Sequence, residues 1–486
     1  MKIALVYPKI REYIKESFGT DGYIANMSGY PPLSLAYVAS IIRKAGHEAV
    51  IIDGNILSLS IDEIVARLKD FSPDLLGFTL TTPTFHSLRG WIKRIREEIN
   101  VPVVAGGALL ELFPREVMEY PEFDYAVIGS AQAPLPALLS ALSGGRDPRV
   151  IPGVCVRNSE GLKVNLPVMD SGEDIRTLPY PARDLLPGGY YFSPFSGRGG
   201  FTAMLTSRGC AFSCSYCCLA KNLRFREVDD IAEEIEECYR RYKIRNIDFY
   251  DSVFTFDKER VLRLCRAIRK LDLSLSWTAR THINLVDRDI LGVMASAGCN
   301  MIMYGIESFQ ESSLRELNRP VLSIPQVKAA VSLTRRNNIS VFGFFMLGIP
   351  GESERMMKEN VRLSRRIGLD FAQFTKLTPI GGTKLYERYL ENTGRDYWRE
   401  YIRSGKRGED IFAAGCRVPP ARILKAVHGA NIGFYFRPAQ LMRIFLRLRG
   451  FSHLFRYSRA AFNMFFSFLA EKRMSDDREN KVYSRA

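Results

Sequence analysis

Two stretches of this 486-residue chain alternate short apolar, β-branched runs with helical patterns, in which apolar residues recur at spacings of three and four. Strands separated by helices in this way pair in parallel, because each helix carries the chain back to the same end of the sheet. In the first stretch, residues 1–145, the predicted strands are Ile3–Tyr7, Ala49–Asp53, Leu75–Leu80, Val101–Ala105 and Tyr125–Ile128. The pattern predicts an α/β fold that begins with a doubly wound, Rossmann-like domain.

The second stretch, residues 199–385, contains six strand–helix units and predicts a partial (β/α)6 barrel of the TIM type. Its predicted strands are Phe201–Thr206, Asn246–Tyr250, Leu273–Ala279, Met301–Ile306, Val341–Leu347 and Phe371–Leu377. Residues 146–198 are richer in Pro and Gly and are interpreted as a linker, and residues 386–486 as a helical, basic C-terminal region. Both kinds of sheet bind ligands at the carboxyl ends of their strands, which is where we expect the site.

The composition is that of a globular protein, with 46% hydrophobic and 25% charged residues, and it excludes a disordered or fibrous chain. Residues 1–8 lack the long apolar run of a signal peptide, which predicts a cytoplasmic protein. In a reducing compartment, the nine cysteines are expected to serve as ligands, nucleophiles or core residues instead of disulfides. The chain contains no run of about 18 apolar residues, so the sequence predicts no membrane-spanning helix.

Cys210, Cys214 and Cys217 form a C-x3-C-x2-C array directly after the first strand of the predicted barrel. Three thiolates on one loop can each bind one iron of a [4Fe-4S] cluster, which leaves the fourth iron open to a substrate or cofactor. The alternatives are three unrelated cysteines or a zinc site, but zinc normally takes four ligands and no fourth Cys or His has suitable local spacing. Cys218 is expected to be a buried thiol that points away from the array.

At these cysteines, and over most of the chain, the sequence resembles the cobalamin-dependent branch of the radical S-adenosylmethionine superfamily. The segments PPLSLAY at residues 31–37 and LPYPARDLLP at residues 178–187 resemble that branch's cobalamin-binding domain and interdomain linker. The resemblance implies that the three cysteines hold the cluster, and that its open iron binds the amino and carboxylate groups of S-adenosylmethionine. One electron from the cluster would then cleave this cofactor to methionine and a 5′-deoxyadenosyl radical.

The same resemblance implies a set of S-adenosylmethionine contacts at the strand ends that follow the cysteines. Tyr216 matches a position near the adenine, Asp251 and Ser252 match the place that holds the methionine amine, and glycines let the backbone approach a flat ring. An arginine suits the carboxylate, since its fork can bind both oxygens. The residues implied are Tyr216, Asp251, Ser252, Glu307, Ser308, Arg319, Gly348 and Gly351.

For cobalamin, the resemblance points to three loops of the first domain, in which hydroxyls could donate to the corrin amides and glycines could permit close approach. The residues are Thr81, Thr82, Gly106, Gly107, Gly129 and Ser130. The chain departs from the family in two respects: it has no D-x-H-x-x-G motif, and it has Gly-Ser-Ala-Gln at residues 129–132 where relatives often carry Gly-Glu-Gly-Glu. The alternative is a domain that only supports the barrel.

Most of the formal charge of +15 lies near the C-terminus, where residues 421–486 carry 13 Lys or Arg and 4 Asp or Glu. Residues 437–459 combine six arginines with apolar residues at helical spacing, which is typical of a helix lying on an anionic membrane. The segment therefore predicts peripheral contact with the inner face of the membrane. A helix packed on the barrel is the alternative, and nucleic acid is not expected because no binding motif accompanies the charge.

Together these features predict a cobalamin-dependent radical enzyme. The main hypothesis is a methyltransferase that acts on an unactivated carbon of a hydrophobic substrate. Such a C–H bond resists general bases, so a radical is needed, and the cofactors supply that chemistry. The substrate classes expected are a lipid, an isoprenoid or hopanoid, or a tetrapyrrole, and a ferredoxin or flavodoxin is the expected electron donor. The alternatives are a radical cyclase, carbon-coupling enzyme or oxidase without methyl transfer, a transfer RNA methylthiotransferase, and a non-catalytic cluster protein.

Overall fold

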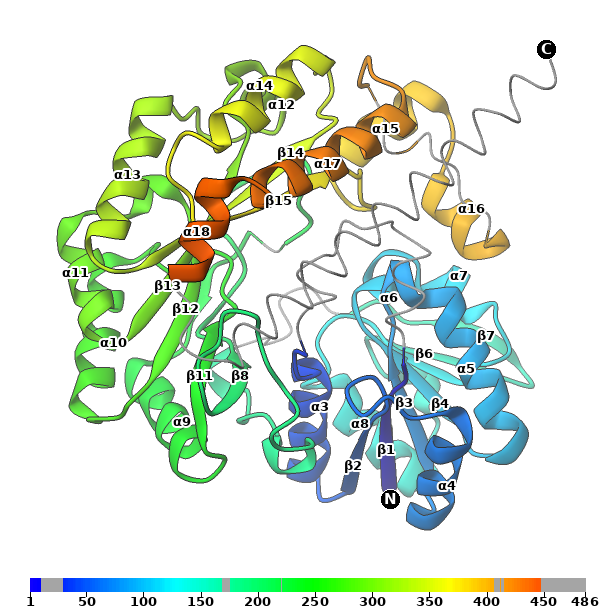
Figure 1. Ribbon diagram of the computed structural model, residues 1–486. Coiled ribbons are helices and arrows are strands. Elements are labelled where there is room, and N and C mark those ends of the chain that lie inside the picture. Colours follow the sequence, from blue (N-terminus) through cyan, green and yellow to red (C-terminus); the bar gives the residue numbers. More distant parts are fainter. Residues whose placement is uncertain (10–28, 168–174, 220, 406–410, 412–414, 447–486) are drawn as a thin grey trace.

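The computed structural model describes residues 1–9, 29–167, 175–219, 221–405, 411 and 415–446. Figure 1 shows two α/β lobes side by side, the N-terminal domain in blue and cyan and the barrel in green and yellow. Each lobe has helices packed on a largely parallel sheet, so the α/β fold class predicted from the sequence is confirmed.

The N-terminal sheet has seven strands in the order β2-β1-β3-β4-β5-β6-β7, and the first five in that order are parallel. These parallel strands are β1 (Lys2–Tyr7), β2 (Glu48–Asp53), β3 (Leu75–Thr79), β4 (Val103–Gly106) and β5 (Tyr125–Val127). The helices are α3 (Leu33–Lys44), α4 (Ile61–Phe71), α5 (Phe85–Glu98), α6 (Ala108–Leu112), α7 (Pro114–Met118) and α8 (Pro134–Ser143). The five strands predicted from periodicity are all present, with ends that differ by one or two residues.

Strands β6 (Val154–Asn158) and β7 (Gly161–Val164) extend this sheet as an antiparallel hairpin. The hairpin lies within residues 146–198, which the sequence pattern had suggested as a linker. Its apolar run, Val154 to Val156, is too short to stand out in the sequence, but it is buried against strand β5. A two-residue connection suffices for an antiparallel pair, and Gly161 supplies a positive φ of 107° at the turn.

The barrel has six parallel strands in the order β15-β14-β13-β12-β11-β8. They are β8 (Gly200–Met204), β11 (Ile244–Phe249), β12 (Ser276–Thr281), β13 (Cys299–Glu307), β14 (Ser340–Leu347) and β15 (Phe371–Lys376). The helices of the barrel are α9 (Val228–Arg240), α10 (Lys258–Lys270), α11 (Arg288–Ser296), α12 (Glu311–Glu316), α13 (Ile324–Arg336) and α14 (Glu354–Ser364). Strand β12 begins three residues later than predicted, because the preceding leucines form the turn after α10, where the amide of Leu275 donates to the carbonyl of Leu273.

The barrel strands separate two apolar layers, because successive side chains point to opposite faces. Ile302, Tyr304 and Val341 lie in the main core beneath the helices. Met301, Met303 and Phe342 face the other way and form a smaller cluster inside the curved sheet, together with Phe371 and with Phe195 from the linker. The inner face of strands β13 to β15 is therefore apolar near the start of each strand, where this cluster lies.

The linker is held to the barrel by a buried group of charges. Arg183, in the short turn η5 (Arg183–Leu185), forms an ion pair of 2.7 Å with Glu234 of α9. Arg226 pairs with the other carboxylate oxygen of Glu234. All three side chains are almost fully buried, and the hydroxyl group of Tyr37 from α3 lies near them. This group joins the linker, the barrel and the N-terminal domain.

The C-terminal helices pack on both lobes. They are α15 (Lys384–Thr393), α16 (Tyr397–Ser404), α17 (Pro420–Tyr435) and α18 (Pro438–Leu446). Tyr397, Trp398 and Tyr401 of α16 join the core of the N-terminal domain. Helix α17 covers edge strand β15, whose Phe374 amide donates to the side-chain oxygen of Asn431 at 3.1 Å. This contact protects the backbone of the edge strand.

The predicted basic amphipathic segment is described only in its first part. Helix α18 covers the start of residues 437–459, and residues 447–486 lie outside the described residues. The described part packs against the barrel, because Arg437 donates to the carbonyl of Arg365 at 3.0 Å. Within the described chain, no helix is long and apolar enough to cross a membrane.

Candidate active site

The three cysteines of the array lie on one loop at the carboxyl end of strand β8. Strands β9 (Ser207–Arg208) and β10 (Arg224–Phe225) pair in antiparallel fashion and close the base of this loop. Burial raises the pKa of the Cys210 thiol, and the neighbouring Cys214 and Cys217 raise it further, so the three sulfurs share one environment. In the described chain no three Cys, His, Asp or Glu side chains are arranged around a single metal ion. A four-iron cluster instead takes each thiolate at a separate corner.

The loop is held in place by contacts from distant parts of the barrel. The amide of Ser215 donates to the carbonyl of Leu317 at 3.0 Å, and its carbonyl accepts from the amide of Leu385 at 2.8 Å. The side chain of Asn318 donates to the carbonyl of Ser213 at 2.6 Å. The spacing of the cysteines is therefore fixed by tertiary contacts as well as by the loop itself.

Three of the residues predicted to contact S-adenosylmethionine meet beside Cys214. The hydroxyl of Tyr216 donates to Oε1 of Glu307 at 3.2 Å, and a guanidinium nitrogen of Arg319 lies 3.8 Å from the same oxygen. Arg319 also donates to the sulfur of Cys214 at 3.7 Å. Burial raises the pKa of Glu307, and Arg319 and Tyr216 partly oppose this shift. The arrangement places a carboxylate and a guanidinium directly against the cysteine loop.

Glu307 also has an uncommon backbone conformation, with a φ of 63°. The left-handed region costs a residue with a side chain about 1–2 kcal/mol, so other contacts must hold it there. The donor from Tyr216 and the charge of Arg319 are such contacts. Strain of this kind gathers at functional sites, which agrees with a role for this strand end in binding.

Four buried polar atoms around the cysteine loop have no hydrogen-bond partner in the described structure: Ser207 Oγ, His282 Nε2, Glu307 Oε2 and Arg319 Nε. Buried polar groups are normally paired, so such a group of atoms indicates the place of a polar ligand. Donors and a carboxylate together match the carboxylate, ammonium and hydroxyl groups of S-adenosylmethionine. The residues present therefore fit the cluster and this cofactor.

His282 was missed by the sequence analysis, although it directly follows strand β12. Its ring lies 5.2 Å from that of Phe212 in the cysteine loop. The amide of Asn284 donates to Nδ1, so the neutral ring carries its hydrogen on Nε2. Burial, with Arg319 nearby, lowers the pKa of His282 to about 4, and the ring is a neutral donor at the edge of the site.

Asp251 lies at the base of the cysteine loop, where its carboxylate accepts hydrogen bonds from the amides of Thr206, at 2.7 Å, and Ser207, at 3.2 Å, and from the Thr206 hydroxyl. These bonds shape the turn from strand β8 into the loop. A carboxylate can accept about four hydrogen bonds, so these three leave room for one more donor. The contact of Asp251 with the methionine amine stays a prediction. Ser252 beside it is half-buried.

Ser308, directly after strand β13, lies in a buried network, and its predicted contact with S-adenosylmethionine stays a prediction. Its hydroxyl accepts from the side-chain nitrogen of Asn360 at 2.9 Å, and the same nitrogen donates to Glu352 at 3.0 Å. Glu352 accepts from the amide of Gly348 at 2.9 Å. The network joins the ends of strands β13 and β14 and shapes the loop of Gly348 and Gly351, whose φ angles are 81° and 78°. Asn360 and Glu352 were not among the residues predicted.

This network makes a testable prediction about pH. Burial raises the pKa of Glu352 from 4.5 to about 7. Between these values the folded chain holds a proton that the unfolded chain has lost, so the free energy of unfolding falls as pH rises through this window. The total fall from this group is up to about 3 kcal/mol. Denaturant titrations should show that Glu352→Gln lacks this decline, and equal pH profiles for the two proteins would contradict it.

In the N-terminal domain, the three loops predicted for cobalamin follow three adjacent strands. Thr79 pairs with Gly106, which brings Thr81 and Thr82 close to Gly106 and Gly107. Gly107 has a φ of 107°, and a Cβ there would lie 2.6 Å from the carbonyl oxygen of Leu80, so only glycine fits. A Cβ at Gly106 would meet no atom within 4 Å, which leaves a bare surface above the strand end.

The third loop has lost the acids that relatives often carry. Gly129 has a φ of 74°, and the amide of Gln132 donates to the hydroxyl of Ser130 at 3.3 Å. Gln132 also donates to the hydroxyl of Thr177 in the linker at 3.3 Å. A glycine turn at the end of β5 remains, with neutral groups in place of carboxylates. The open surface at Gly106 and the hydroxyls around it fit a bulky cofactor such as cobalamin.

Loops at the strand ends of the barrel and of the N-terminal domain meet across the boundary between the lobes. Gly381 and Gly382, which follow strand β15, pack on helix α6 and the residue after it: a Cβ at Gly381 would lie 3.1 Å from the ring of Phe113, and one at Gly382 would lie 2.8 Å from Leu112. Glu111 of α6 is close enough to raise the pKa of Cys218, although burial raises it more. The carboxyl end of β4 and the cysteine loop therefore lie at one site. Cys218, expected to be buried, is exposed.

Comparison with known proteins agrees with this geometry. Residues 27–139 match the B12 binding domain, and residues 204–364 match the Radical SAM superfamily. An uncharacterized methyltransferase of Pyrococcus horikoshii is 31% identical, over 93% of this chain and 96% of its own. The anaerobic magnesium-protoporphyrin IX monomethyl ester cyclase of Rubrivivax gelatinosus is 25% identical, over 77% of this chain and 69% of its own.

Among solved structures, the radical S-adenosylmethionine methyltransferase TsrM of Kitasatospora setae, with cobalamin and a [4Fe-4S] cluster bound, has the same fold. The TM-score is 0.63 at 20% identity, over 80% of this chain and 78% of that one. The chain belongs to the family of radical S-adenosylmethionine enzymes with a B12-binding domain. It is a radical enzyme of the methyltransferase type whose cofactors are a [4Fe-4S] cluster, S-adenosylmethionine and cobalamin.

Proposed function

We propose that this enzyme transfers a methyl group to an unactivated carbon of a hydrophobic substrate. The observation that carries the proposal is the packing of Gly381 and Gly382, from the loop after strand β15, on Leu112 and Phe113 beside the cobalamin loops. The same part of the barrel holds the cysteine loop, because the amide of Leu385 donates to the carbonyl of Ser215 at 2.8 Å. When bound, the cofactors supply the radical and methyl-transfer chemistry. The chain itself holds them at one site, through the three cysteines, the pair of Glu307 and Arg319, and the glycine loops of the first domain.

The inner face of the barrel supports a hydrophobic substrate. Above the cluster of Met303 and Phe342, the same face continues with Phe344 and Met346, because alternate residues of strand β14 point the same way. Both Phe344 and Met346 are only half-buried. An apolar wall that leads from the barrel interior toward the cysteine loop suits the body of a lipid or a tetrapyrrole.

The opposite wall is polar and suits one hydrophilic end of such a substrate. Arg280 binds Asp248 through two nitrogens, at 2.9 Å each, and the Tyr30 hydroxyl donates to Asp248 at 2.6 Å. The ring of Tyr250 lies 4.2 Å from the guanidinium of Arg280 and is half exposed. The ion pair is already satisfied by its neighbours, so we propose that Tyr250 presents the first contact to an incoming polar group.

A second candidate is a radical cyclase or oxidase that acts without methyl transfer. The relative from Rubrivivax gelatinosus, named as a cyclase of magnesium-protoporphyrin IX monomethyl ester, favours it. The same two cofactor loops and the same apolar wall would serve such an enzyme. The two candidates differ in the fate of the methyl group of S-adenosylmethionine.

The test is an anaerobic reaction of the reconstituted enzyme with S-adenosylmethionine labelled in its methyl group, together with a cell lipid extract. Methyl transfer predicts 5′-deoxyadenosine and label in an extracted lipid or pigment. Cleavage without label in any product supports the second candidate. Absence of 5′-deoxyadenosine from a preparation that holds its full iron would refute both.

A glycine at the cobalamin loop provides a separate prediction. Gly106→Val places its Cβ where no protein atom lies within 4 Å, so we expect the chain to fold as before. The valine would occupy the surface proposed for cobalamin, and overpacking of this kind costs about 1–3 kcal/mol, or about 10–100-fold in affinity. Cobalamin binding, followed by absorbance, should show this loss. Gly90→Ala on α5, which also meets no neighbour, is the control, and an equal effect of the two would contradict the assignment.

We further propose that the enzyme works in the cytoplasm with a ferredoxin or flavodoxin as reductant. None of the nine cysteines forms a disulfide, which supports a reducing compartment. The basic C-terminal segment supports contact with an anionic membrane, as its sequence pattern predicts.

A further inference from the structure

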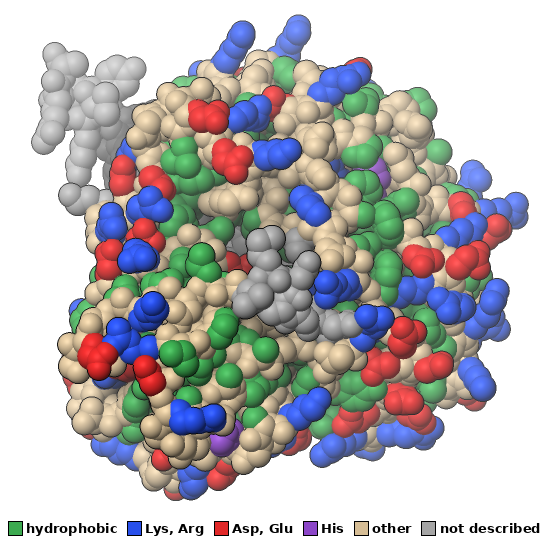
Figure 2. All heavy atoms as spheres, turned by 180° about the vertical axis from the view of Figure 1, so that it is seen from behind, with side chains coloured by type: hydrophobic (Ala, Val, Ile, Leu, Met, Phe, Trp, Pro, Cys, Tyr) green, Lys and Arg blue, Asp and Glu red, His purple; other side chains and the backbone are tan. Residues whose placement is uncertain are grey.

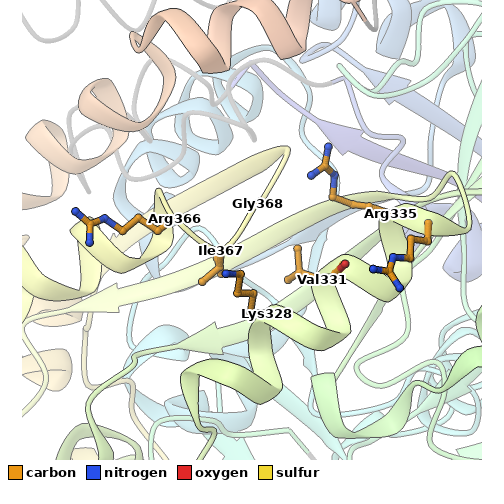
Figure 3. Close-up of a pocket in the computed structure, with 8 residues that line it drawn as sticks. Lys328, Val331, Arg335, Arg366, Ile367 and Gly368 are labelled. Atoms are coloured by element: carbon orange, nitrogen blue, oxygen red, sulfur yellow. The ribbon is translucent and has the colours of Figure 1, made fainter.

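A cationic cavity of about 380 Å³ lies at the amino-terminal end of the barrel, away from the cysteine loop. Figure 3 shows Lys328, Val331 and Arg335 of helix α13 on one side of it and Arg366, Ile367 and Gly368 on the other. Arg336 and the hydroxyl-bearing Ser332 complete the lining. None of these eight residues is acidic, and four of them carry a positive charge, of which Arg335 lies 3.6 Å from the buried carboxylate of Asp370.

Exposed apolar side chains lie on the neighbouring element. Helix α18 packs on the loop that forms one wall of the cavity, because Arg443 donates to the carbonyl of Leu369 at 3.4 Å and Gln440 donates to that of Asp370. Leu441 and Met442 of α18 are 48% and 58% exposed. Phe436, between α17 and α18, is 40% exposed. A cationic cavity and an apolar ridge thus adjoin each other.

The charge at this place differs from that of the face shown in Figure 2. Figure 2 shows blue and red side chains interspersed over the face it presents, as on an ordinary protein surface. Basic residues often close the last turn of a helix, where they favour its dipole, and Arg335 and Arg336 close α13 in this way. That role accounts for two of the charges, but not for Lys328 and Arg366 or for the apolar ridge.

We propose that this surface docks the enzyme on an anionic lipid bilayer, with lipid phosphate groups in the cavity and Leu441 and Met442 inserted among the acyl chains. Cationic and apolar groups side by side match the headgroup and hydrocarbon layers of such a membrane. An acidic protein would match the charges, but would leave the apolar ridge without a counterpart. The inference rests on the membrane contact proposed above and is independent of the substrate class.

The experiment is sedimentation of the full-length holoenzyme, kept anaerobic, with vesicles of phosphatidylglycerol and phosphatidylcholine. Each Lys or Arg near an anionic surface contributes about 1 kcal/mol, or about fivefold in partitioning. The variant Lys328→Gln/Arg336→Gln/Arg366→Gln should therefore bind about 100-fold more weakly. These three side chains are exposed, so the melting temperature should stay as in the wild type. Leu441→Ser/Met442→Ser should also weaken binding, with no change of charge.

The matched control is Arg266→Gln/Arg269→Gln/Lys270→Gln, which removes three exposed charges from helix α10. Charges farther than about 10 Å from the docked surface are screened, so the control should change binding by less than about threefold. Equal losses in the two triple variants would overturn the assignment, as would a wild type that fails to sediment or that binds pure phosphatidylcholine equally well. Slower reduction of the variant by a flavodoxin, with vesicle binding unchanged, would point instead to an acidic protein and would also overturn it.

Discussion

Cys214→Ala should abolish reductive cleavage of S-adenosylmethionine, with 5′-deoxyadenosine formation reduced by at least about 10³-fold. Cys214 is the most buried of the three cysteines in the array and lies against Arg319. Without its thiolate, one iron of the cluster loses its protein ligand, and the cluster should not assemble in stable form. Iron content, the visible absorbance of the anaerobic protein and 5′-deoxyadenosine formation measure the effect.

Cys218→Ser is the control for this variant, since the chain offers a fourth cysteine directly beside the array. Cys218 is exposed and faces Glu111 of the N-terminal domain, so its loss should leave both the iron content and the cleavage activity near those of the wild type. A Cys214→Ala protein that keeps its iron and its turnover would refute the assignment of the loop. A Cys218→Ser protein that loses its iron would show that the ligand set is different.

The second large effect is expected on stability, from Glu234→Gln in helix α9. Glu234 lies fully buried between Arg183 and Arg226; it compensates Arg183, and it shares Arg226 with Asp230 of the same helix. Removing one member of a buried ion group leaves uncompensated charge in the interior, which costs about 3–5 kcal/mol. The free energy of unfolding, measured anaerobically with denaturant, should fall by that amount.

Glu236→Gln on the same helix is the matched control. Glu236 forms an exposed pair with Arg240 at 2.7 Å, and exposed pairs contribute about 0–1 kcal/mol. The two variants carry the same chemical change and differ only in burial. If both destabilise the protein equally, the buried group does not hold the linker to the barrel in the way that the structure indicates.

The elements of both domains could be predicted because their signals are local. Helix α4 is an example, since Ser60 and Glu63 form a capping box at its start and apolar residues recur along one face. The hairpin of β6 and β7 was not foreseen, because its run of apolar residues is short and its stability comes from burial against β5. Helix α16 lies in the region predicted to be helical, but the packing of its aromatic residues on the N-terminal domain was not foreseen, because it joins parts that are distant in the chain.

The candidate site was predictable only in part, for the same reason. Tyr216, Glu307 and Arg319 follow from motifs, and the structure brings them together at Cys214. Ser308 belongs to a motif as well, but its buried bond with Asn360 could not be predicted, because Asn360 lies 52 residues further along the chain. His282 belongs to no motif that the sequence displays, and only its position next to Phe212 reveals it.

The cysteine ligands and the class of chemistry are predicted from sequence alone, because the spacing of three thiolates along a short loop is a covalent property that folding does not alter. The carboxyl ends of the strands are predicted to within two residues, since periodicity is local. Only the tertiary structure decided which strand ends share a site, which polar atoms stay unpaired beside the cysteines, and that Gly381 meets Phe113 across the two lobes. Those outcomes depend on packing between residues far apart in the chain, and no local pattern encodes them.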